Sequence, residues 1–147
     1  KNNFDFFIPF GKANVTRSGN DVTVLCYSST VSLVTEAAKE LAKQNLDVEV
    51  IDLRTISLPD IDYETIGVSM RKTNIIVIVE QAQASCAIGP KIAHECQKRF
   101  FDYLDGPIVT VSGLDIPLPV SQKLEAAAVP NVEQAKEAIY HAAKFKL

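Results

Sequence analysis

The stretch IIVIVEQAQASCAIGPKI, residues 75–92, decides the fold class. Its first five residues are apolar, and they end at an acid, Glu80. A short run so rich in β-branched residues is typical of a buried strand. Small and polar residues follow, and Gly89-Pro90 then opens a predicted helix, because proline suits a first helical turn. Open parallel sheets bind ligands at strand ends of this kind, so the stretch bears on function as well as on fold.

The rest of the chain repeats the alternation of strand and helix. Strands are expected at residues 21–27, 48–53 and 108–113, and helices at 28–45, 63–73, 89–104 and 132–147. Asp60 or Asp62 is expected to cap the second helix. Residues 6–19 are expected to add an edge strand, and residues 114–131 form a proline-punctuated loop with one short helix. This order predicts an α/β fold with three layers: a mostly parallel sheet of about five strands with helices on both faces.

Length and composition limit the class of protein. The 147 residues are 47% apolar and 22% charged, which suits one domain covering residues 1–147. A net charge of −3 argues against nucleic acid as the main partner. No apolar run is long enough to cross a membrane, and the N-terminus lacks the pattern of a signal peptide. The three cysteines form no CxxC pair, which is typical of a reduced intracellular compartment.

The first two strand ends predict structure more strongly than chemistry. Ser28, Ser29 and Thr30 are expected to cap a helix rather than to bind phosphate, because no glycine lets a ligand approach the backbone. Arg54 is a candidate anion clamp, but an ion pair with Asp52 or Asp60 is the better prediction.

The third strand end is the most polar one. Cys86 near a helix N-terminus is a candidate nucleophile, but it needs a base, and both histidines, His94 and His141, are expected to face solvent. Glu80 is a candidate general base, although a strand-end acid is more often held by backbone N–H groups of the next helix. No strand end carries a complete catalytic set, so the sequence assigns no catalytic, cofactor-binding or metal-binding residue.

Several motifs carry a family resemblance. The most specific are VEVIDLRT (48–55), LDGPIVTVSGLDIPLP (104–119) and LEAAAVPNVEQ (124–134). In order and spacing they resemble the C-terminal domain of transketolase-like enzymes, with the beta chains of the first component of pyruvate dehydrogenase as the nearest group. The loop QAQASCAIG (81–89), where the family usually has an aromatic-Pro-Gln segment, and the slightly long SLPDIDYET (57–65) depart from the family pattern.

The resemblance implies a role within a larger enzyme. The chain would be the C-terminal domain of a beta subunit whose pyrimidine-binding domain precedes it. Thiamine diphosphate and Mg would be held by domains absent here, so this domain alone would be inactive. It would contact an alpha subunit and a second beta subunit in a heterotetramer that decarboxylates pyruvate and transfers the acyl group to lipoamide. The compartment would be a bacterial cytoplasm or a mitochondrial matrix.

The same resemblance implies a docking site. In the family, an acid of the LDxP turn and the terminal carboxylate bind the peripheral-binding domain of the dihydrolipoamide acyltransferase. These map to Asp105 and Leu147, and Asp105 is equally well explained as a turn acid before Gly106-Pro107. Three alternatives stay open: a branched-chain 2-oxo acid dehydrogenase beta subunit, a regulatory anion-binding module built on Ser85 and the Gly89-Pro90 helix start, and a thiol enzyme built on Cys86.

Overall fold

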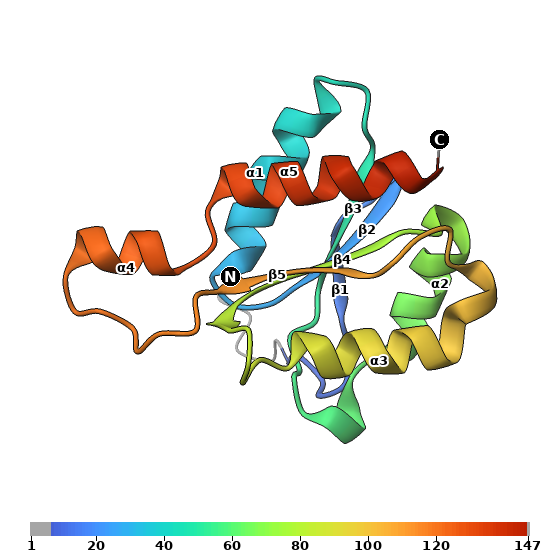
Figure 1. Ribbon diagram of the computed structural model, residues 1–147. Helices are drawn as coiled ribbons and strands as arrows, with labels where there is room; N and C mark the ends of the chain where they lie inside the picture. The colour runs from blue at the N-terminus through green and yellow to red at the C-terminus, as the bar shows by residue number, and fades with distance from the viewer. Residues whose placement is uncertain (1–6, 147) are drawn as a thin grey trace, which may run out of the picture.

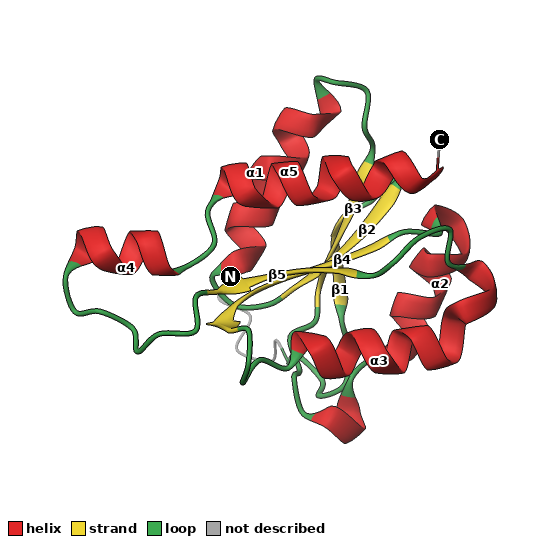
Figure 2. Cartoon of the chain, viewed as in Figure 1, coloured by secondary structure: helices red, strands yellow, loops and turns green. Residues whose placement is uncertain are grey.

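A five-stranded sheet forms the centre of the protein, in the order β1-β3-β2-β4-β5. The computed structural model describes residues 7–146. Strands β2 (Val22–Cys26), β3 (Val48–Asp52), β4 (Ile76–Gln83) and β5 (Val109–Gly113) are parallel, and β1 (Asn14–Arg17) pairs antiparallel with β3 at one edge (Figures 1 and 2). The predicted α/β fold, with its edge strand before residue 21, is therefore confirmed.

Helices cover both faces of the sheet. Helices α1 (Thr30–Ala42) and α5 (Val132–Ala143) pack on one face, and α2 (Tyr63–Thr73) and α3 (Gly89–Phe100) pack on the other (Figure 1). Side chains of a strand alternate between the two faces, so Val77 and Val79 join the core under α1 and α5, while Ile76 and Ile78 join the core under α2 and α3. Burial on both sides explains why the β4 sequence is apolar without a break as far as Val79.

Helix ends agree with the sequence in part. Asp62, not Asp60, caps α2, since its carboxylate accepts the Thr65 N–H at 3.1 Å. Asn45, with φ of 62°, follows α1 as expected. At the start of α1, Ser29 occupies the cap position, but its hydroxyl donates to Gln81 Oε1 at 2.8 Å and does not cap the helix. The buried Thr30 hydroxyl donates to the Tyr27 carbonyl oxygen at 2.8 Å.

Several element ends differ from the prediction. Helix α1 begins at Thr30 and ends at Ala42, inside the expected range 28–45. Strand β4 continues past Glu80 to Gln83, because Gln83 pairs with Gly113 of β5, a contact between distant parts of the chain. Helices α3 and α5 end earlier than expected, and each is followed by a 3-10 turn, Phe101–Tyr103 and Lys144–Lys146. The short helix expected in residues 114–131 is α4 (Gln122–Ala128). Within residues 7–146, no helix has the length and apolar character needed to cross a membrane.

Candidate functional site

The parallel strands β2 to β5 all terminate at one end of the sheet, which we call the carboxyl edge. The buried side chain of Glu80 lies at the centre of this edge. Its carboxylate accepts the Gly89 N–H at 2.9 and 3.1 Å, the Tyr27 hydroxyl at 3.0 Å and the Ser112 hydroxyl at 3.2 Å. These donors come from the start of α3 and from the ends of β2 and β5. Among residues 7–146, no lysine or arginine forms an ion pair with Glu80. These hydrogen bonds therefore compensate for the hydration that the carboxylate loses on burial. Glu80 is held by the next helix, as the sequence predicts for a strand-end acid.

Gly89 is required by this arrangement. A Cβ atom at position 89 would lie 2.1 Å from Glu80 Oε1, closer than real atoms approach. The absence of a side chain lets the backbone N–H reach the carboxylate at the positive end of the helix dipole. Glu80 in turn affects Tyr27, because burial and the neighbouring carboxylate both raise the pKa of the phenol. Tyr27 is therefore a neutral hydrogen-bond donor at physiological pH.

The loops that follow β4 and β5 are joined by hydrogen bonds beside the Glu80 side chain. The Ala84 N–H donates to the Gly113 carbonyl at 3.3 Å, the Ser85 N–H donates to Asp115 Oδ1 at 2.8 Å, and Gln83 Nε2 donates to the Ile116 carbonyl. A hollow of about 260 Å³ lies between the loops, and it is lined mainly by apolar groups, including Leu114, Leu118 and Ala128. The roles of Tyr27, Ser112 and Asp115 were not predicted from the sequence, since nothing local marks a side chain whose partner lies far along the chain.

The candidate nucleophile has no base in the described part of the chain. Cys86 is exposed, and the hydrogen-bond partner of its sulfur is the Ser85 hydroxyl at 3.7 Å. His94 and His141 are exposed on α3 and α5, as predicted, and neither bonds to Cys86. No three His, Cys, Asp or Glu side chains of residues 7–146 gather in a way that could hold a metal ion. Within residues 7–146, the structure thus brings no histidine into hydrogen-bond contact with the Cys86 thiol.

The candidate anion sites are already engaged by carboxylates. Glu80 takes the Gly89 N–H at the start of α3, and Asp115 takes the Ser85 N–H. A bound phosphate would meet negative charge at both groups. Arg54 forms the expected ion pair with Asp52, with 3.9 Å between Nε and Oδ2. These contacts argue against a regulatory anion site at the carboxyl edge.

The predicted docking residue Asp105 lies at the opposite end of the sheet, where the parallel strands begin; we call this end the amino edge. It is exposed, and its N–H donates to the Asn74 carbonyl at 3.0 Å, just before β4. A Cβ atom on Gly106 would lie 2.7 Å from Phe145 Cβ, so this turn touches the last turn of the chain. Leu147, the other predicted docking residue, lies outside the described residues.

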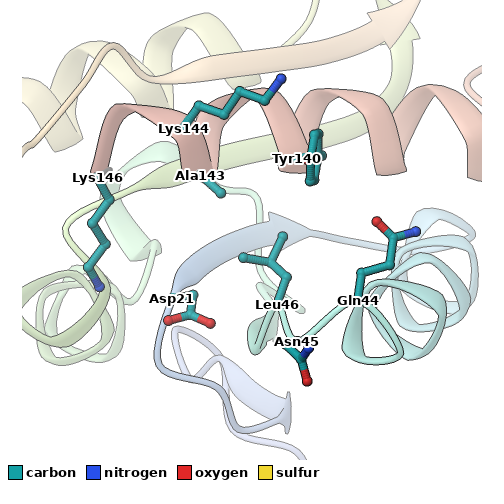
Figure 3. Close-up of a pocket in the computed structure, with 8 residues that line it drawn as sticks. All are labelled: Asp21, Gln44, Asn45, Leu46, Tyr140, Ala143, Lys144 and Lys146. Carbon is teal, nitrogen blue, oxygen red and sulfur yellow. The ribbon is translucent and has the colours of Figure 1, made fainter.

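A groove of about 380 Å³ adjoins the same last turn (Figure 3). Its walls come from the start of β2, the α1–β3 connection and the C-terminal helix. Lys144 Nζ lies 4.8 Å from the centre of the Tyr140 ring, and Lys146 Nζ donates to the Asn20 carbonyl at 3.3 Å. The amino edge therefore carries the cationic groups of Lys144 and Lys146 as well as the acid Asp105.

Comparison with known proteins settles the family. Residues 11–135 match the family model described as transketolase, C-terminal domain. The chain belongs to the transketolase C-terminal domain family. Among solved structures, this transketolase C-terminal domain is similar to a split-gene transketolase in an inactive beta4 tetramer, with a TM-score of 0.82 and 24% identity over 97% of this chain and 46% of that one. That likeness agrees with the fold described above.

Relatives of this transketolase C-terminal domain include longer proteins that are enzyme subunits. It is 46% identical over 132 residues to the pyruvate dehydrogenase E1 component subunit beta of Rickettsia felis, covering 90% of this chain and 40% of the relative. It is 40% identical over 135 residues to the subunit of the same name from Rhizobium meliloti, covering 92% and 29%. The mitochondrial subunit of Dictyostelium discoideum is 46% identical, with 85% and 35% covered. The chain thus spans 29–40% of the length of these relatives.

Proposed function

We propose that this chain is the C-terminal domain of the beta subunit of a thiamine-diphosphate-dependent pyruvate dehydrogenase. In the assembled heterotetramer it supports the oxidative decarboxylation of pyruvate and acyl transfer to lipoamide. The observation that carries the proposal is 40–46% identity to pyruvate dehydrogenase beta subunits over 85–92% of the chain. These relatives are bacterial and mitochondrial, so the proposed compartment is a bacterial cytoplasm or a mitochondrial matrix.

The described residues do not fit a binding site for thiamine diphosphate and Mg. A diphosphate needs free backbone N–H groups or cations, and a metal ion needs clustered oxygen ligands. At the carboxyl edge, the N–H groups of Gly89 and Ser85 are used by carboxylates of the chain itself. No group of three potential metal ligands lies within residues 7–146. We therefore assign the cofactor and its chemistry to domains outside this chain, and assign assembly and docking to this domain.

The two edges of the sheet suit two kinds of contact. The polar amino edge, with Asp105 and the C-terminal turn, is proposed to dock the peripheral-binding domain of the dihydrolipoamide acyltransferase. Contact between Gly106 and Phe145 supports this proposal, because it brings the Asp105 turn next to a residue that precedes Leu147 by two positions in the sequence. The remaining surfaces are proposed to contact the pyrimidine-binding domain, the alpha subunit and the second beta subunit.

A hybrid enzyme tests this function. In the Rickettsia felis beta subunit, the C-terminal region aligned with this chain is replaced by this chain, and the hybrid is produced with its alpha subunit. We expect an assembled heterotetramer that turns over pyruvate within about tenfold of the parent, equivalent to a barrier change of about 1.4 kcal/mol. A hybrid that folds but neither assembles nor turns over pyruvate would refute the proposal.

A further inference from the structure

The segment between β5 and α5 leaves the body of the protein and returns to it. The Leu114 N–H donates to the Ala128 carbonyl at 2.9 Å, and this bond closes the segment at its base. We call residues 114–128 the excursion. It extends away from the end of β5, and its helix α4 stands apart from the other helices (Figure 1). The excursion is the largest departure from the layered fold among the described residues.

Helix α4 has almost no packing partner within the described chain. Of its seven residues, only Ala128, at its end, is buried. Leu124 in its middle is 60% exposed. A helix this short is not stable in water by itself, because its few hydrogen bonds do not offset the cost of ordering the first turn. A second surface must therefore cover α4 for it to persist.

The excursion presents an apolar surface to that partner. Its exposed apolar side chains are Leu114, Ile116, Leu118, Val120 and Leu124. Of its acids, Asp115 is already bonded to the loop after β4. Two prolines, Pro117 and Pro119, restrict the backbone, so little entropy is lost on binding. An apolar surface with few free charges is typical of a permanent interface rather than a transient one.

The polypeptide that precedes this domain would arrive at the same edge. Because β1 is antiparallel, Asn14 lies opposite Asp52, at the carboxyl end of β3. Residues 7–13 consequently lie at the carboxyl edge beside β3, and the excursion departs from the same edge at β5, on the other side of the sheet. Phe7 and Phe10, at 74% and 89%, are among the most exposed apolar side chains there. The relatives have most of their length outside the matched region, which supplies an occupant of sufficient size.

We propose that the excursion is the surface on which the preceding domain of the same subunit packs, and that this contact orders α4. The inference rests on the proposed function, since it takes the chain as one domain of a longer subunit. Beyond that function, it specifies that residues 114–128 form the contact and that the contact is mainly apolar.

Hydrogen exchange and sedimentation test the inference in two settings. In the isolated 147-residue chain, amides of residues 122–128 should exchange at nearly unprotected rates, and the chain should sediment as a monomer. In the assembled hybrid subunit the same amides should be protected by about 100-fold or more. Protection of α4 in the monomeric chain would overturn the inference. So would a dimer of the isolated chain with α4 protected, because a second copy would then be the occupant.

A pair of matched variants separates this inference from the proposed function. Val120→Asp and Val68→Asp both place a charge at an exposed valine, but Val68 lies on α2, away from the excursion. In the hybrid, Val120→Asp should reduce the yield of assembled enzyme at least tenfold, whereas Val68→Asp should leave it unchanged. An active hybrid that tolerates both changes overturns the inference alone, and an unmodified hybrid that fails to assemble overturns the proposed function.

Discussion

At the scale of single residues, the contact between Glu80 and Gly89 controls the carboxyl edge. Gly89→Ala would place a methyl group 2.1 Å from Glu80 Oε1 and disturb a carboxylate that holds three elements together. We expect the free energy of unfolding to fall by about 1–3 kcal/mol, as for other overpacked sites. Urea denaturation measures this, with Pro90→Ala at the exposed neighbouring position as the control. Equal stability of the two variants would show that Glu80 adapts freely.

The three thiols differ in reactivity for a physical reason. Burial raises the pKa of Cys26 and Cys96 to about 12, so both remain protonated and unreactive in the folded chain. Cys86 is exposed. A colorimetric thiol reagent at pH 7.5 should modify one cysteine per native chain and all three in denaturant, and Cys86→Ser should abolish the native reaction. Rapid reaction of two or more thiols in the native chain would contradict the packing described here.

At the scale of elements, the start of α2 depends on the charge of Asp62. Burial opposes ionisation, but hydrogen bonds from Thr65 and Ala13 prevail and hold the pKa of Asp62 below its ordinary value. The charged form therefore stabilises the fold above the unfolded pKa of about 3.9, and this contribution is lost as pH falls through the lower folded pKa.

Asp62→Asn isolates that effect, because asparagine also caps helices. The variant should be less stable than the parent at pH 6, and the difference should shrink steadily toward pH 2. Denaturation curves at several pH values measure it. A difference that stays constant with pH would mean that the charge contributes nothing.

Local patterns predicted most elements, and the contacts between distant segments account for what was missed. The run from Ile75 to Val79 predicts a buried strand because its signal is contained in neighbouring residues. The extension of β4 to Gln83 depends on pairing with Gly113, which no local pattern reveals. The position of Glu80 at a strand end predicts that backbone N–H groups of the next helix hold it. Its partners Tyr27 and Ser112 lie far away in the sequence, so no local pattern predicts them. The exposed position of α4 is not predicted either. LEAAA is a good helix-forming sequence, but helix propensity does not indicate whether a helix packs on the rest of the protein.

At the scale of the whole molecule, two edges of one sheet are proposed to have different partners. Asp105→Ala at the amino edge should slow association with a peripheral-binding domain of the acyltransferase by about 3–10-fold and weaken the dependence of the association rate on salt. Asp102→Ala, an exposed acid in the preceding 3-10 turn, is the control. Surface plasmon resonance with the hybrid subunit measures both rates. Identical kinetics for the two variants and the parent would remove Asp105 from the docking surface.

We propose above that the cofactor chemistry belongs to domains outside this chain. Calorimetric titration of the isolated 147-residue chain with thiamine diphosphate and Mg²⁺ tests it most directly, with the assembled hybrid as the positive control. We expect saturable heat for the hybrid and none for the isolated chain up to millimolar cofactor. Saturable binding at micromolar concentration by the isolated chain would contradict it.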